Sequence, residues 1–303
     1  MPGFWTHIIA GDLIIDEIEN TSLKNMIKSH KKFFNLGCQG PDFLYFNNFW
    51  PWKKNTEGNK AGGVFHTKKI KKLFFWGIDY IKQKKNNDFF EQLLIYFYGY
   101  ATHYIIDSIF HEYICKITDT SEDHVFLEIK LDEYLVNKIW NKKVISLNPL
   151  TEINSGIKIP SNIEEFFQEA LTVIYDYNSE VKFINQSYRD FKIALWILYA
   201  PTFMTIKKLG FNIVNYFLTW DINKIVYVNK EEDFPLFKEK VADNFNNLLS
   251  RSVKVGEVLV YYLNEFMEGK VKKRELQNMI SEIEENYKTE KFALEDISRI
   301  ISL

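Results

Sequence analysis

The apolar residues of this chain recur with the period of an α-helix over most of its length, and this pattern limits the fold more than any other feature. The first such run follows Thr6, which is a plausible N-cap, and consists of Ile8, Ile9, Leu13, Ile14 and Ile18. Further helical patterns cover residues 67–82, 88–117, 121–140, 161–176, 187–208, 234–267 and 273–287. Alternation typical of a strand is scarce, with residues 224–228 as the best short candidate. The sequence therefore predicts an all-α fold.

Glycine and proline predict irregular connections in the first part of the chain. Gly37, Gly40 and Pro41 predict a loop, and residues 43–63 read as irregular. Neither an internal repeat nor a Pro/Gly/Ser-rich linker divides the 303 residues, so we expect one all-α domain over residues 1–303. The uncharged run of 14 residues at 193–206 contains Pro201 and is shorter than the roughly 20 residues that cross a bilayer, so it predicts a buried helix and no transmembrane segment.

Charge and cysteine content narrow the functional classes. The net charge of −2 argues mildly against long nucleic acids as partners. Two cysteines, without a CxxC motif, do not form a disulfide framework, and the first residues lack the charged and apolar regions of a secretory signal. These features predict a cytoplasmic protein. The aromatic content of 17% has two readings, a compositional bias or an aromatic-lined substrate site.

The strongest chemical signal is the segment from His103 to His111. His103, Asp107 and His111 are spaced four residues apart, so on a helix they form one polar stripe. The residues between them are mostly Tyr, Ile and Phe, and an unpaired carboxylate would be costly in such surroundings. A divalent cation would compensate the charge of Asp107.

The next predicted helix repeats this spacing with His124 and Glu128. Imidazole nitrogen and carboxylate oxygen are ligands that zinc accepts when thiolates are absent. A pair on one helix that faces a triad on its neighbour is a known way to build a metal site in a helical bundle. One such pair alone more often indicates a hydrogen-bonded core or surface pair; two on successive helices favour a metal site.

Three further candidates lie upstream. Asp42 follows Gly40-Pro41, His66 precedes the predicted helix at residue 67, and His7 opens the first helix. His30 lies in the polar stretch Ser-His-Lys-Lys and is interpreted as a surface residue.

The order of these residues resembles the zinc-dependent phospholipase C family, whose superfamily also includes zinc-dependent single-strand nucleases. The openings Met-Pro-Gly-Phe-Trp-Thr-His at residues 1–7 and Leu-Gly-Cys-Gln-Gly-Pro-Asp at residues 36–42 are similar to a signal-less bacterial branch of that family. The motifs cover residues 1 to about 135, so residues 1–140 form the predicted metal-site half and residues 141–303 a helical half without a recognised motif.

The resemblance implies two or three zinc ions. A first zinc would be held by Asp42, His66, His103 and Asp107. A second would be held by His111, His124 and Glu128. A third would be shared by His7 and a bridging Asp107. Secreted members complete the third site with a processed N-terminal tryptophan, whereas Trp5 is internal here. Secreted members also have five residues between the aspartate and the next histidine, whereas three residues separate Asp107 from His111 in this chain.

The function implied by the resemblance is hydrolysis of a phosphodiester, with phospholipid as a possible substrate, by a zinc-activated water for which Asp42 is the candidate general base. Ten lysines and two acids between Lys53 and Lys85 predict attraction to a phosphate-bearing substrate or peripheral contact with an anionic membrane, or simply a solvated face. A nuclease or nucleotidase on the same metal core and a non-catalytic metal-binding scaffold remain alternatives.

Overall fold

The computed structural model describes residues 3–50, 53, 57–85, 89–177, 181–198 and 239–287. These residues are all-α, as predicted, and contain no strand. The first half comprises α1 Phe4–Glu17, α2 Thr21–Ser29, α3 Lys31–Cys38, the 3-10 helix η1 Asp42–Phe46, α4 Glu57–Thr67, α5 Ile70–Gln83, α6 Phe90–Ile117 and α7 Ser121–Trp140. The second half comprises η2 Val144–Ser146, α8 Pro149–Ile153, α9 Ser161–Tyr175, α10 Phe183–Leu198, α13 Glu239–Met267 and α14 Lys273–Tyr287.

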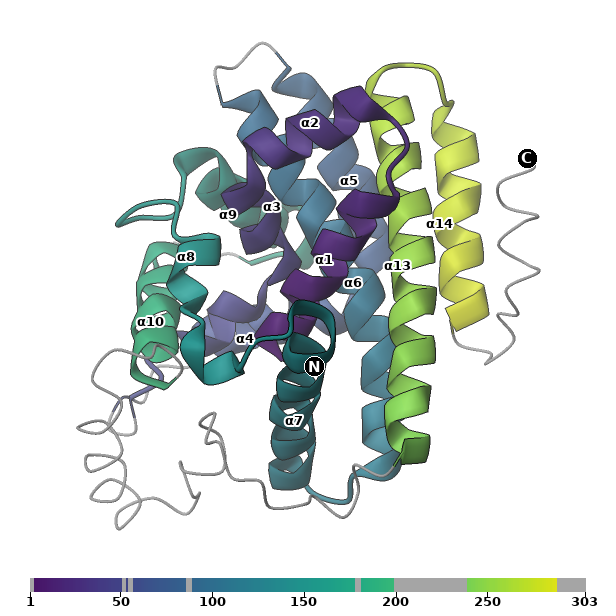
Figure 1. Ribbon diagram of the computed structural model, residues 1–303. Coiled ribbons are helices and arrows are strands. Elements are labelled where there is room, and N and C mark those ends of the chain that lie inside the picture. Colours follow the sequence, from purple (N-terminus) through teal and green to yellow (C-terminus); the bar gives the residue numbers. More distant parts are fainter. Residues whose placement is uncertain are drawn as a thin grey trace.

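Helix α6 is the central element of the molecule. Every residue from Leu93 to His103 is buried. Most side chains of this stretch are apolar or small on every face of the helix, which is typical of a helix in the centre of a core. Its neighbours include α3, α13, α1, α5, α7 and α9, and Figure 1 shows α13 beside α6 with α14 on the outside of α13. His103, the first metal-ligand candidate of α6, therefore lies inside the core.

One contiguous hydrophobic core includes residues from α1 through α14. Aromatic rings supply much of it, among them Phe65, Phe97, Phe166 and Phe167, which contact one another edge to face across α4, α6 and α9. The aromatic richness is thus used at least in part for packing. The prediction of a single domain also covers residues 199–238 and 288–303, so it stays a prediction.

Several local predictions were wrong. Gly37, which was expected to mark a loop, lies within α3, and most of α4 falls in the stretch 43–63 that was expected to be irregular; α2 was not predicted. Thr6 is not the N-cap of α1: Gly3 is, and it has no side chain with which to cap. The strand candidate at 224–228 and the end of the uncharged run at 199–206 lie outside the described residues. Among the helices that the structure describes, none combines the length and apolar character that a bilayer span requires.

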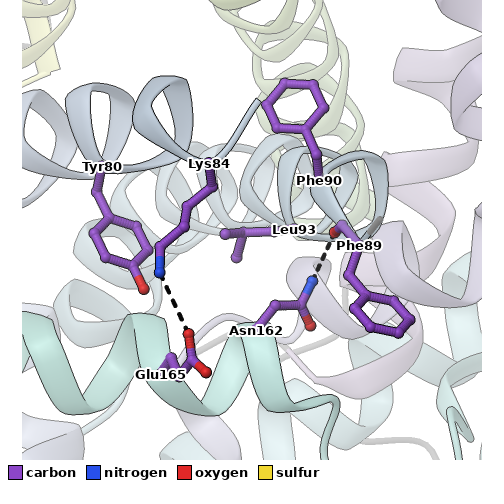
Figure 2. A pocket seen from close by; sticks show the side chains of 7 residues that line it. All are labelled: Tyr80, Lys84, Phe89, Phe90, Leu93, Asn162 and Glu165. Atoms are coloured by element: carbon purple, nitrogen blue, oxygen red, sulfur yellow. Dashed lines mark hydrogen bonds and ion pairs between the residues drawn. The ribbon is translucent and has the colours of Figure 1, made fainter. Parts of the chain in front are cut away.

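A small pocket lies where α5, α6 and α9 meet (Figure 2). Lys84 Nζ is 3.5 Å from Glu165 Oε2 across it, and the side-chain amide of Asn162 donates to the carbonyl of Phe89 at 2.8 Å. Its volume of about 10 Å³ is enough for roughly one water molecule. This pocket between α5, α6 and α9 is too small to bind a substrate.

Candidate metal centre

Five of the predicted ligands converge in the core from four elements. His7 comes from α1, Asp42 from the start of η1, His66 from the last turn of α4, and His103 and Asp107 from α6. Ligand atoms of His7, Asp42 and His103 lie within 4.8 Å of one another, and so do those of His66, His103 and Asp107. We call these five residues the inner cluster.

The spacing inside the inner cluster matches a zinc site. Asp42 Oδ1 is 2.9 Å from His66 Nε2 and 3.7 Å from His103 Nε2, and the two Nε2 atoms are 3.3 Å apart. Tetrahedral zinc with bonds of about 2.0–2.1 Å places its ligand atoms about 3.3 Å from one another. The three atoms therefore already form one face of such a tetrahedron.

Close helix packing brings Asp42 to His103. Gly37 of α3 and Gly99 of α6 face each other, and a Cβ on Gly99 would lie 2.1 Å from the carbonyl oxygen of Phe34. At Gly40 the backbone turns with a φ of +51°, and a Cβ there would lie 2.2 Å from the His103 ring. Only glycine satisfies both conditions, so the loop can lie directly against the imidazole.

Helix α1 is held in place by a carboxylate from a distant helix. Asp132 of α7 is fully buried and accepts hydrogen bonds from the backbone amides of Trp5 at 3.0 Å and Thr6 at 2.7 Å, and from the Thr6 hydroxyl at 2.7 Å. It thereby caps the first turn of α1 from outside, next to His7. The sequence indicated only that Asp132 is four residues after Glu128, and its capping role was missed.

Backbone carbonyl groups orient His103 and His66 of the inner cluster. His103 Nδ1 lies 3.1 Å from the carbonyl oxygen of Cys38, and His66 Nδ1 lies 2.8 Å from that of Gly62. A proton on each Nδ1 can be donated to these carbonyls, which leaves Nε2 as the lone-pair atom that faces the cluster. The Tyr45 hydroxyl also lies 3.2 Å from His66 Nδ1.

Burial and mutual charge set the protonation states. Burial lowers the pKa of His7 well below its ordinary value and also lowers the pKa of His103, so both imidazoles are neutral, which is the metal-binding form. Burial raises the pKa of Asp42, but the electrostatic effect of the neighbouring His103 and the hydrogen bond from His66 outweigh it and hold that pKa at about 2. For His66, burial lowers the pKa but the hydrogen bond to Asp42 outweighs it and raises the pKa.

The inner cluster leaves buried polar atoms without partners. Within the described part of the chain, neither ring nitrogen of His7 and not Oδ1 of Asp107 has a hydrogen-bond partner. The His7 ring stacks on His103 at a centroid distance of 4.5 Å. Orphaned buried groups of this kind are rare because each costs about 1–3 kcal/mol, and a bound cation would satisfy them. The residues therefore fit a zinc site.

The remaining predicted ligands meet near the C-terminal end of α6. The rings of His111 and His124 are 5.3 Å apart, and His124 Nε2 lies 2.8 Å from Glu128 Oε1. Cys115 joins them, with ligand atoms of His111, Cys115 and His124 within 4.8 Å of one another. We call His111, Cys115, His124 and Glu128 the outer cluster; burial lowers the pKa of His111.

Sequence reasoning did not include Cys115, although a signal was present. Cys115 follows His111 by four residues and thus continues the stripe that starts at His103. His7 is grouped with Asp42 and His103 and not with a bridging Asp107. His30, interpreted as a surface residue, is partly exposed, and its Nε2 lies 3.8 Å from Glu91.

A comparison with protein-family models matches residues 6–179, more than half of the chain, to the family described as zinc dependent phospholipase C. The chain belongs to the zinc-dependent phospholipase C family. Searches of curated proteins and of solved structures returned no match. The matched stretch contains both clusters and extends past α9, well beyond the residue 135 at which the motifs in the sequence stop. Zinc dependence and a phosphoester-hydrolase type follow from this membership.

Proposed function

We propose that this chain hydrolyses a phosphodiester, with a phospholipid as the first candidate substrate, at a centre of two or three zinc ions. The observation that carries the proposal is the inner cluster, whose nitrogen and oxygen atoms have the mutual distances of zinc ligands and include buried atoms without partners. Membership of a zinc-dependent phospholipase C family supports the same reaction class.

In this proposal the inner zinc is held by Asp42, His66, His103 and Asp107, and His7 serves a further ion beside them. A second zinc would be held at the outer cluster by His111 and His124, with Glu128 beside His124. When bound, zinc lowers the pKa of a coordinated water to about 7 and polarises the phosphoryl oxygens.

The residues of the chain itself position the reaction. Asp42 is anionic at every physiological pH, because its pKa is about 2. We propose that its carboxylate accepts a hydrogen bond from the attacking water and so orients it, while a pKa this low makes Asp42 only a weak general base. The carbonyl groups of Cys38 and Gly62 keep His103 and His66 in one orientation throughout.

The substrate would carry negative charge. Lys60, Lys68 and Lys72 are exposed on α4, α5 and the turn between them, close in sequence to His66. Lysines near a metal centre raise the local concentration of anionic substrates, including phospholipid headgroups at a membrane surface. This supports a phosphate-bearing substrate without distinguishing a lipid from a soluble diester.

The test is a hydrolysis panel on protein purified without chelator: phosphatidylcholine vesicles, a chromogenic phosphodiester and single-stranded DNA. Phosphatidylcholine cleavage would support the phospholipase activity, whereas cleavage of DNA alone would favour the nuclease alternative. His66→Gln should abolish hydrolysis and lower the metal content by about one ion per chain, and the matched variant His30→Gln should change neither. A protein that holds zinc but cleaves nothing on the panel would refute the enzyme proposal in favour of a metal-stabilised scaffold.

A further inference from the structure

The outer cluster has a soft sulfur donor at ligand distance from two imidazoles. Cys115 Sγ lies 3.5 Å from His111 Nε2 and 3.9 Å from His124 Nδ1. In a tetrahedral zinc site with a Zn–S bond of about 2.3 Å and Zn–N bonds of about 2.0–2.1 Å, sulfur and nitrogen lie about 3.6 Å apart. The sulfur therefore lies at about the spacing of a zinc ligand from both imidazoles, and ligand atoms of the three residues lie within 4.8 Å of one another.

His124 turns its two nitrogens to different partners. Nδ1 faces Cys115, while Nε2 lies 2.8 Å from Glu128 Oε1. A neutral imidazole has one N–H and one lone pair, so a proton that Nε2 donates to Glu128 leaves the lone pair on Nδ1, on the side of Cys115 and His111. A carboxylate behind a histidine in this way orients the ring and makes it a better ligand.

We propose that the Cys115 thiolate is the third protein ligand of the outer zinc, with His111 and His124, and that Glu128 orients His124 without touching the metal. The inference rests on the proposed metal centre and deepens it. On binding, the S–H bond of Cys115 breaks, the proton leaves to solvent and a sulfur–zinc bond forms, with no change of oxidation state. Three protein ligands leave a fourth position open to water or substrate.

The arrangement also ties two helix ends together. Cys115 and His111 are on the last turns of α6, and His124 is on the first turn of α7. The side-chain oxygen of Thr120 accepts a hydrogen bond from the backbone amide of Asp123 at 3.1 Å and caps α7 at this point. A metal bound by all three residues would hold the turn between these helices against thermal opening.

Cobalt substitution tests the proposal, because a thiolate bound to Co²⁺ gives an intense near-ultraviolet charge-transfer band that nitrogen and oxygen ligands do not give. Metal-free protein titrated with Co²⁺ should develop this band, Cys115→Ser should lack it, and the matched variant Cys38→Ser should keep it. Glu128→Gln should also keep the band. The zinc affinity of the outer site should fall at least about tenfold in Cys115→Ser, because even loss of a group that only supports a ligand costs about 10–100-fold.

The outcomes separate this inference from the proposed function. Cobalt bound with visible ligand-field bands but no thiolate band would overturn the role of Cys115 and leave the metal centre intact. Loss of one ion in Glu128→Gln with full retention in Cys115→Ser would assign the ligand role to Glu128 and also overturn the inference. Absence of any bound cobalt would overturn both. Circular dichroism verifies folding of each variant, and the exposed position of Cys115 predicts unchanged helicity.

Thiol labelling provides a second measurement. In metal-free protein Cys115 is exposed and should react with a maleimide, whereas added zinc should slow its modification at least about tenfold, since the lone pairs of the sulfur are then engaged. Equal labelling rates with and without zinc, under conditions in which the protein binds the metal, would overturn the proposal.

Discussion

Replacement of Asp132 by Ala should destabilise the protein more than an ordinary surface or helix substitution. The Asp132 carboxylate accepts three hydrogen bonds from the first turn of α1 and is fully buried. Hydrogen bonds to a charged group contribute about 1.5–3 kcal/mol each, and they are not additive. We expect Asp132→Ala to lower the free energy of unfolding by about 3–4 kcal/mol, because the amides of Trp5 and Thr6 lose their acceptor inside the core.

Two milder variants separate the contribution of the Asp132 charge from that of the Thr6 hydroxyl. Asp132→Asn keeps an oxygen acceptor but loses the charge that interacts with the N-terminal end of the helix dipole, so we expect a loss of about 1–2 kcal/mol. Thr6→Val removes only the hydroxyl donor and keeps the side-chain shape, for a loss of about 1 kcal/mol. The loss of unfolding free energy should therefore be largest for Asp132→Ala, smaller for Asp132→Asn and smallest for Thr6→Val.

Gly3 offers a perturbation from the opposite side of the contact. A Cβ at Gly3 would lie 2.5 Å from Asp132 Cγ, so Gly3→Ala must displace the carboxylate from its three donors. Gly3→Ala should therefore be costly in the wild-type background and much less costly when Asp132 is already Ala. Such coupling in a double-mutant cycle is the signature of direct contact.

The assay is urea unfolding followed by far-ultraviolet circular dichroism, with chelator present so that zinc binding does not contribute to stability. Unfolding free energies of wild type and Asp132→Ala that agree within about 1 kcal/mol, at an unchanged dependence on urea, would refute the reasoning. Because His7 follows directly after the capped turn, the same variant should also bind less metal when chelator is removed.

Four further predictions concern Gly40, the pair Gly99 and Gly63, a buried thiol and metal removal. Gly40→Ala should cost about 1–2 kcal/mol for its left-handed backbone and displace His103, which metal analysis would detect as a lost ion. Gly99→Ala should lower the unfolding free energy by about 3 kcal/mol, because the added Cβ would collide with the backbone of α3. Gly63→Ala should raise it by about 0.5–1 kcal/mol, because this helical glycine has nothing within 4 Å of the added Cβ. Equal effects of the two variants in urea unfolding would contradict this account. Burial raises the pKa of Cys38 to about 12, so the folded protein should leave this thiol protonated and unalkylated at pH 8 by mass spectrometry, in contrast to protein in urea. Chelator should lower the thermal midpoint, and its restoration by zinc rather than magnesium would identify the ion; a midpoint insensitive to chelator would count against a bound metal.

The sequence predicts the arrangement of the candidate site wherever its geometry is local. His103, Asp107 and His111 share one helical face because they are four residues apart, and the same holds for His124 and Glu128. The bounds of α7 and α14 were also predicted correctly, since long periodic runs define helices well. Helices α2, α3 and α4 are short, and the glycines of α3 and α4 favour loops, so these three helices were missed.

The sequence by itself therefore determined the all-α class and which side chains lie on one face of α6 and of α7, because backbone spacing alone sets those relations. Tertiary structure alone decided that α6 meets Asp42 through the Gly37–Gly99 contact and that Asp132 holds α1 in place of Thr6 as cap. It also decided which nitrogen of His124 faces Cys115. These relations join residues far apart in the chain, and they depend on how closely helix surfaces pack, which a helical period does not encode.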